Sequence, residues 1–255
     1  NAADALQKRN AQRTIQEERT TGAVKELAQA LGLDFVPRRI EGFDISNTQG
    51  AQSVASMVVF IDGQPDKKEY RHFRIKTVEG ANDFASMNEV LGRRFRRVRA
   101  EDEKDRWPKP DLVLVDGGPE QLRFARAAML ETGENVPMFG LAERLEEIYL
   151  PNRSEPIRLS ARSPALHLIQ RIRDESHRFA ITHHRKLRGK AAIHSRLEEV
   201  PGIGPARRRA LLAHFRTMKA IGEATQEELA QVKGMTGETA RALYAVLHPE
   251  DEPRA

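Results

Sequence analysis

Short segments in which apolar residues alternate with polar ones, or run together, recur between residues 39 and 150. Such segments are typical of β-strands. The sequence predicts six strands: Arg39–Ser46, Val54–Ile61, Glu69–Lys76, Asp111–Asp116, Pro137–Ala142 and Glu147–Leu150. Asp62-Gly63 is a turn signal between the second and the third. Asp111–Asp116 is almost wholly apolar, which is expected of a strand that is buried on both faces.

Apolar residues at helical spacing predict helices around these strands. The helices cover residues 82–99, the segment after Gly117-Gly118-Pro119 and residues 164–187. Residues 1–31 are polar and predict a lead-in helix that Pro37 closes. Arg188–Arg196 is basic, has few large apolar residues and is predicted to be a linker. The expected fold class is α/β, a mixed sheet with flanking helices.

The C-terminal part of the chain contains a repeat. Leu197–Phe215 aligns without gaps on Leu229–Leu247, and seven of the nineteen aligned positions are identical. Apolar positions keep helical spacing in both copies, so each copy is predicted to form a helix, a tight glycine turn and a second helix. Residues 197–250 are therefore expected to form a small all-α domain.

The turn Pro201–Gly204 indicates what this domain binds. Glycine permits a positive φ, and the exposed N–H groups then face an anion together with the positive end of the next helix. Such a turn binds a phosphate without contacting a base, which points to sequence-independent DNA binding. The candidate DNA-binding residues are Gly202, Ile203, Gly204, Arg207, Arg208, Gly234 and Thr236. Arg209 adds further charge beside the first turn. The alternative is a pair of helical hairpins that pack for stability alone.

The two copies differ at the turn. Thr236 stands where the first copy has its second glycine, and the second copy lacks the arginine cluster. The first turn is therefore expected to hold DNA more strongly than the second.

Composition agrees with a polyanionic partner. The net charge is +5, hydrophobic residues make up 39% of the chain and aromatic residues only 5%, which favours backbone binding over base stacking. The chain has no cysteine, so disulfides, cysteine-based zinc sites and thiol nucleophiles are excluded. No apolar run is long enough to cross a bilayer, and a cytoplasmic location is expected. The chain opens on Asn, as a fragment of a longer protein would.

Two aspartates are candidate metal ligands. Asp44 lies inside a predicted strand, where an ionised carboxylate is costly unless a cation or a partner holds it. Asp116 ends the buried strand, where a carboxylate opens onto a crevice. Together they could hold Mg²⁺ or Mn²⁺ through oxygen ligands. The alternatives are a salt bridge for Asp44 and a cap before Gly117 for Asp116.

Two further residues make no case from the pattern alone. Asp83 stands at a predicted helix start, where the simplest role is that of an N-cap. His177 lies on the polar face of a predicted helix, where a histidine is usually solvated, and His183 and His184 lie close by.

Several separated motifs resemble one family. They are Phe43–Ser46, Asn82–Met87, Asp111–Gly118 and Ile172–Ala180, followed by the hairpin pair. This arrangement resembles the C-terminal half of UvrC, the incision nuclease of bacterial nucleotide excision repair. The resemblance implies an RNase H-like fold for residues 37–187, preceded by the lead-in at 1–36, and a tandem helix-hairpin-helix for the repeat.

The resemblance also implies a reaction. UvrC cuts the damaged strand of double-stranded DNA on the 5′ side of a lesion, working on a UvrB–DNA complex, and Asp44, Asp83, Asp116 and His177 match the positions required for that cut. Asp44 and Asp116 would hold the metal, and His177 could transfer a proton. One metal or two are both compatible with this set. The chain departs from the family pattern at Asn47 and at Pro119-Glu120.

Two other functions compete with this one. The first is a DNA-binding adaptor whose acidic sheet is catalytically inactive. The second is a ribonuclease in which the arginine-rich stretch Arg93–Arg99 binds RNA. The simplest account of that stretch is a solvated helix face.

Overall fold

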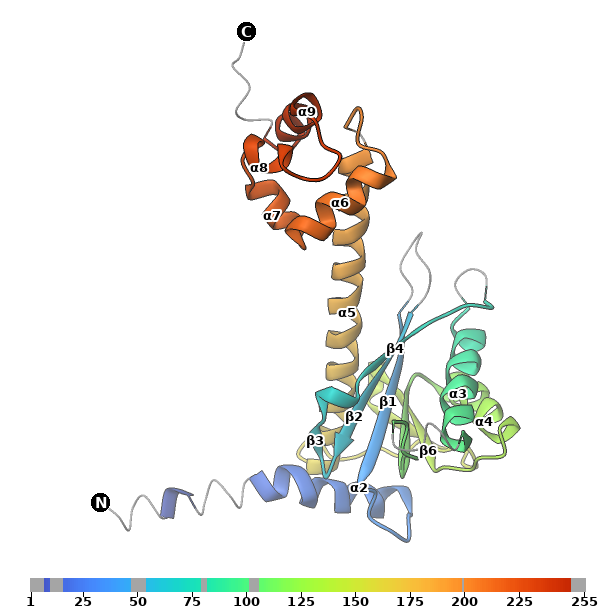
Figure 1. Ribbon diagram of the computed structural model, residues 1–255. Coiled ribbons are helices and arrows are strands. Elements are labelled where there is room, and N and C mark those ends of the chain that lie inside the picture. Colours follow the sequence, from blue (N-terminus) through green and yellow to red (C-terminus); the bar gives the residue numbers. More distant parts are fainter. Residues whose placement is uncertain are drawn as a thin grey trace. The chain divides into compact units, whose positions relative to one another are not determined.

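The computed structural model describes residues 7–9, 16–46, 54–78, 82–100, 106–198 and 200–248 (Figure 1). Asn47 lies outside these ranges. The chain forms two compact units that divide between Thr182 and His183. Within the described ranges, every helix is too short or too polar to span a bilayer.

One sheet organises the first unit. Its strands are β1 (Arg39–Ser46), β2 (Val54–Ile61), β3 (Gln64–Pro65), β4 (Arg71–Arg74), β5 (Leu112–Asp116), β6 (Met138–Ala142) and β7 (Glu147–Tyr149). The strand order is β3-β2-β1-β5-β6-β7, and β4 also pairs with β2. β1 is antiparallel to β2 but parallel to β5, and β5 is parallel to β6. The predicted mixed sheet is confirmed.

The six predicted strands all form. The bounds of β1 and β2 match the prediction, whereas β4 is shorter than the predicted Glu69–Lys76. Glu69 ends a 3-10 turn, and the N–H of Lys76 donates to the side chain of Glu89. The turn predicted at Asp62-Gly63 has positive φ at both residues and is followed by β3, a short strand that the pattern did not predict.

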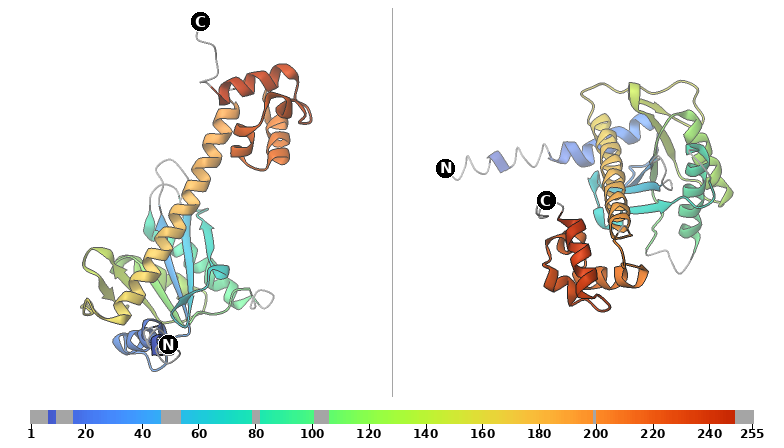
Figure 2. Two further views of the ribbon diagram at one scale, coloured as in Figure 1. Left: turned by 90° about the vertical axis from the view of Figure 1, so that its left-hand side faces the viewer. Right: turned by 90° about the horizontal axis from the view of Figure 1, so that it is seen from above.

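Helices cover both faces of the sheet. α3 (Asp83–Arg99) and α4 (Pro119–Glu131) lie on one face, and the first part of α5 (Pro164–Glu198) lies on the other (Figure 2). Successive side chains of β1 point to opposite faces of the sheet. Glu41 contacts Arg94 of α3, whereas Gly42 lies against Ile172 of α5.

The arginine-rich stretch of α3 is largely occupied by contacts within the protein. Arg94 is fully buried and donates to both carboxylate oxygens of Glu41, at 2.9 and 2.7 Å. Arg93 pairs with Glu89 at 2.9 Å, and the guanidinium of Arg97 lies 4.3 Å from the centre of the Trp107 ring. These contacts remove most of the support for an RNA-binding helix.

The N-terminal helical segment belongs to this core. A π-helical turn, Glu18–Gly22, leads into α2 (Ala23–Leu31), whose buried residues join the main hydrophobic cluster. α2 ends at Gly32, which has a φ of 69°, and not at Pro37. A left-handed glycine terminates a helix by satisfying its last carbonyl groups, so the break comes before the proline.

The helix predicted to end at Leu187 is longer in the structure and includes the predicted linker. Residues 188–196 are helical in backbone and continue α5 to Glu198. Arginine, lysine and alanine have high helix propensity without an apolar stripe, so low hydrophobicity alone does not end a helix.

The second unit is a small all-α domain, as predicted. It contains α6 (Pro205–Phe215), α7 (Met218–Glu223), α8 (Gln226–Ala230) and α9 (Gly237–Leu247). It has its own hydrophobic core, to which both copies of the repeat contribute: Leu197, Val200, Ile203, Leu211, Ile221, Ala224, Leu229, Val232, Ala240 and Leu243.

Candidate functional site

Asp44 and Asp116 lie side by side at one edge of the sheet. Phe43 of β1 pairs with Val115 of β5 in a parallel register, so the next residues along the two strands are neighbours. Both side chains are 9% exposed. This adjacency is the one that the sequence predicted for two metal ligands.

His177 of α5 completes the group. Its Nε2 lies 2.5 Å from Oδ2 of Asp116 and 3.7 Å from Oδ1 of Asp44. One ligand atom from each of the three residues lies within 4.8 Å of the others. Two carboxylates and an imidazole at this spacing are a donor set suited to a divalent cation. The structure thus gives His177 a contact that its helical position alone did not indicate.

Close packing of α5 on the sheet sets the position of His177. A Cβ atom built on Gly42 would lie only 2.5 Å from Cγ2 of Ile172, so the glycine lets the helix approach β1 directly. Ser56 of β2 donates a buried hydrogen bond of 3.1 Å to the carbonyl of Ser176, the residue before His177. Sequence reasoning missed these contacts, and the glycine inside a predicted strand was the available signal.

A second cluster holds the same turn of α5 from the side of β4. The hydroxyl of Tyr70 donates to Glu175 at 3.1 Å, and Arg178 donates to the same carboxylate. Hydrogen bonding from Arg178 holds the pKa of Glu175 below its ordinary value, against the effect of burial. Burial and the neighbouring Glu175 raise the pKa of Tyr70, which therefore stays a hydrogen-bond donor.

A tight turn carries the chain from Asp116 into α4. The N–H of Gly117 donates to the carbonyl of Leu141 at 3.0 Å, and the N–H of Gly118 donates to the side chain of Gln121 at 2.8 Å. A Cβ atom on Gly117 would overlap Gln121. Pro119 is the first residue of α4, where its missing N–H costs nothing.

Asp83 lies outside the group of three. It is the first residue of α3, and the N-cap is Asn82, whose side chain accepts from the N–H of Ala85 at 3.0 Å. The expectation that Asp83 itself is the N-cap is therefore wrong by one residue. Its predicted catalytic role stays a prediction.

Glu89 holds the chain that precedes Asp83. Its carboxylate accepts from the backbone N–H groups of Lys76 and Thr77, at 3.0 and 2.9 Å, and from the Thr77 hydroxyl at 2.7 Å. Partial burial raises the pKa of Glu89, but the hydrogen bonds from Thr77, Lys76 and Arg93 lower it below its ordinary value. Glu89 is thus an ionised anchor for the end of the strand segment that leads towards α3.

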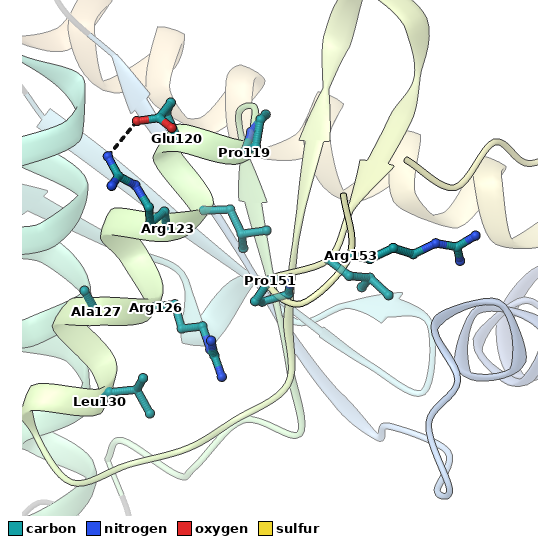
Figure 3. Close-up of a pocket in the computed structure, with 10 residues that line it drawn as sticks. Pro119, Glu120, Arg123, Arg126, Ala127, Leu130, Pro151 and Arg153 are labelled. Carbon is teal, nitrogen blue, oxygen red and sulfur yellow. Dashed lines mark hydrogen bonds and ion pairs between the residues drawn. The ribbon is translucent and has the colours of Figure 1, made fainter. Parts of the chain in front are cut away.

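A separate hollow of about 400 Å³ lies along the outer side of α4 (Figure 3). Its lining includes Pro119, Leu130 and Pro151 together with Arg123, Arg126 and Arg153. Arg123 is turned towards Glu120, at 2.8 Å. None of the three clustered residues lines this hollow, so the candidate site is the sheet edge and not this pocket.

The two glycine turns of the second unit have nearly the same backbone. Gly202 and Gly234 have φ values of 84° and 87°. In the first turn the N–H of Ile203 donates to the carbonyl of Val200, and in the second that of Met235 donates to Val232. The predicted positive φ is confirmed at Gly202 and Gly234, whereas Gly204 has a φ of −80°.

The helix that follows each turn begins differently. Gly204 is the N-cap of α6 and offers no side-chain cap. Thr236 is the N-cap of α9, and its hydroxyl accepts from the N–H of Thr239 at 3.3 Å, while its own N–H donates to the Thr239 hydroxyl at 2.8 Å. In the second copy, N–H groups that could contact an anion are thus already engaged.

The three arginines after the first turn have different surroundings. Arg208 is only 8% exposed, Arg207 is partly buried and Arg209 is exposed. The sequence-based prediction was that all three form one basic cluster that faces DNA. Of the three, only Arg209 presents a side chain mainly to solvent.

Family models match both units of the chain. A family model described as the UvrC RNase H endonuclease domain matches residues 28–181. The chain belongs to the UvrC family. A model of the SAM-like tandem helix-hairpin-helix matches residues 195–248. The UvrC match begins inside α2, in agreement with the place of that helix in the core.

Curated UvrC relatives extend along nearly the whole chain. The UvrABC system protein C of Dehalococcoides mccartyi is 47% identical, and that of Moorella thermoacetica 48% identical, each over 97% of this chain. The chain spans 41% and 40% of their respective lengths and corresponds to a C-terminal portion of them.

Solved structures show more distant likenesses. Human ENDOV superposes with a TM-score of 0.34 at 14% identity, covering 58% of this chain and 86% of that chain. Endonuclease V of Ciona intestinalis, solved with inosine-containing DNA, gives a TM-score of 0.34 at 16% identity over 54% of this chain and 58% of that chain.

Proposed function

We propose that this chain carries the metal-dependent nuclease centre that makes the 5′ incision on the damaged DNA strand in nucleotide excision repair. The observation that carries the proposal is the convergence of Asp44, Asp116 and His177, with ligand atoms within 4.8 Å of one another at the edge of the sheet. Membership of the UvrC family supports the reaction class. The substrate is damaged double-stranded DNA, reached as a UvrB–DNA complex through the longer protein.

The donor set fits a divalent cation. Asp44 and Asp116 are hard oxygen ligands, each mostly buried and therefore costly to keep ionised without a positive partner. Mg²⁺ or Mn²⁺, when bound, supplies Lewis-acid polarisation of the scissile phosphate. Binding the cation is the role that we assign to the two aspartates.

His177 holds or moves a proton at Nε2. An imidazole exchanges protons near neutral pH. Nε2 of His177, a residue of α5, faces the carboxylates. Its place beside the two proposed metal ligands suits His177 to act as a general acid or base in the cleavage. Asp83, the first residue of α3, is proposed to complete the metal shell or to orient water.

The helix-hairpin-helix pair holds the DNA backbone. No acceptor among the described residues takes the N–H groups of Gly204, Ala206 or Arg207, which begin α6. A phosphate can accept from these groups and gains from the positive end of the helix. Because such contacts do not involve base edges, binding is independent of sequence.

The proposal is tested by conservative substitution of the metal ligands. Asp44→Asn and Asp116→Asn, made in the full-length protein, are expected to lower 5′ incision of a lesion-containing duplex by at least about a hundredfold, since each replaces a charged ligand. Duplex affinity should stay unchanged. Asp34→Asn, at an exposed position of the same unit, is the matched control. Incision at the wild-type rate by either ligand variant would refute the assignment.

An inactive DNA-binding adaptor is the second candidate. In that case wild-type protein, supplied with its repair partners and Mg²⁺ or Mn²⁺, would bind the damaged duplex without any chelator-sensitive 5′ cut. The intact group of three residues favours the nuclease.

A further inference from the structure

Arg207 contacts both glycine turns of the helix-hairpin-helix pair. Its Nη1 donates to the carbonyl of Gly202 at 2.5 Å, and its Nε donates to the carbonyl of Gly234 at 2.6 Å. The first carbonyl belongs to the turn of its own hairpin and the second to the turn of the other. One guanidinium thus joins two turns that lie far apart in sequence.

The contact is reciprocated by the aligned residue of the other copy. Thr239 occupies the position in the second copy that Arg207 occupies in the first. A Cβ atom built on Gly202 would lie 2.9 Å from Cγ2 of Thr239, so the second hairpin packs directly on the first turn. Each copy therefore uses the same position to contact the turn of the other copy.

This arrangement suits arginine in particular. A guanidinium presents several N–H donors in a rigid plane, so two carbonyls in different directions can be satisfied at once. No carboxylate of the described residues forms an ion pair with Arg207, so no neighbouring anion offsets its charge between the turns. The two donors that bind the carbonyls are not available to a phosphate.

We propose that Arg207 is a positioning residue that fixes the two phosphate-binding turns at one mutual spacing, so that the pair engages DNA as a rigid unit. This inference rests on the proposed function in one respect only, namely that the turns bind the DNA backbone. It replaces the direct phosphate contact that the sequence suggested for Arg207. The direct contact then falls to Arg209, which is exposed one residue further along α6.

The first test separates the two roles by salt dependence. The full chain would be titrated into a fluorescently labelled, undamaged duplex at a series of KCl concentrations. Arg207→Gln is expected to weaken binding about tenfold, the equivalent of ~1.4 kcal/mol, with an unchanged slope of log K against log [salt]. Arg209→Gln, the matched control, should lower that slope by about 0.9, the value for one lost phosphate contact.

A charge-preserving variant sharpens the result. Arg207→Lys keeps the cation and the aliphatic stem but loses the planar fork, so it is expected to bind as weakly as Arg207→Gln. Recovery of wild-type affinity by Arg207→Lys, or a lower salt slope for Arg207→Gln, would overturn the proposal in favour of a phosphate contact.

The second test needs no DNA. Because the chain has no cysteine, spin labels can be attached to Ala213→Cys on α6 and Arg241→Cys on α9, both exposed positions. Wild-type Arg207 should give a narrow distance distribution between the labels, and Arg207→Gln a broad one with unchanged helicity. If Arg207→Gln unfolds the unit, the distance distribution of Arg207→Lys is compared with that of the wild type instead. Distance distributions of equal width in wild type and variant would refute the positioning role of Arg207.

The two tests fail in different ways. If wild-type protein did not bind the duplex, the proposed function of the hairpins would be refuted. The label distances would still test the positioning role of Arg207. If binding were strong and the distance distribution did not change in Arg207→Gln, only the positioning role of Arg207 would be refuted.

Discussion

The contact between Gly42 and Ile172 leads to the most demanding prediction, because it links packing to catalysis. Gly42→Ala adds a methyl group 2.5 Å from Cγ2 of Ile172 and 3.2 Å from Cγ2 of Val58. Ordinary contact begins at 3.4 Å, so α5 must move away from β1 by about 1 Å. Ile172 is fully buried, and its β-branched side chain has few alternative rotamers.

The magnitude follows from this displacement. Overpacking of a core typically costs about 1–3 kcal/mol, and for a domain of this size each kcal/mol lowers Tm by roughly 2–4 °C. His177 lies on α5 near Ile172 and moves with it. A misplacement of about 1 Å can cost about a hundredfold in rate. We expect a modest loss of stability but a large loss of incision.

The assay compares 5′ incision of a lesion-containing duplex, thermal unfolding and affinity for undamaged duplex. Gly42→Ala should affect the first strongly, the second mildly and the third not at all, because the hairpins form a separate unit. Ile172→Leu removes the γ2 methyl group and should restore part of the incision when combined with Gly42→Ala. Wild-type incision and Tm in Gly42→Ala alone would show that the position of α5 does not depend on Gly42.

Three further predictions concern other parts of the molecule. Arg94→Met removes the partner that contacts both carboxylate oxygens of buried Glu41 and leaves it Arg39, so the free energy of unfolding should fall by up to about 3–5 kcal/mol in denaturant titration; a loss below about 1 kcal/mol would contradict it. Glu89 has a lowered pKa, so its stabilisation is present above its ordinary value of 4.5 and is lost as the pH falls through the lower folded value. The Tm difference between wild type and Glu89→Gln should therefore shrink below about pH 4.5, and a constant difference would be contrary to this account. Gly202→Ala should lower both duplex affinity and Tm because its φ is 84°, whereas Gly204→Ala, with open space around its Cβ, should lower affinity alone; equal Tm losses would argue against the phosphate role of Gly204.

The sheet could be predicted because its signals are local. β1 and β2 alternate or run apolar along their whole length, and Asp44 and Asp116 each stand at a position that strand geometry alone brings to one edge. The glycine turns could be predicted for the same reason, since a positive φ is a property of the residue itself.

Residue roles that depend on distant contacts could not be predicted. His177 faces Asp116 because α5 packs closely on the sheet at Gly42, and helical periodicity does not show which strand a helix will meet. Arg207 was grouped with its neighbours by charge, although its partners include a carbonyl in the other hairpin. The resemblance to UvrC supplied His177, and it said nothing of Arg207.

Asp44 and Asp116 are proposed to hold a divalent cation beside His177. Crystals soaked in Mn²⁺ and measured at a wavelength where manganese scatters anomalously test it most directly. We expect an anomalous peak at the carboxylates of Asp44 and Asp116, and loss of that peak in Asp116→Asn. A manganese peak elsewhere on the protein with none at this site would contradict it.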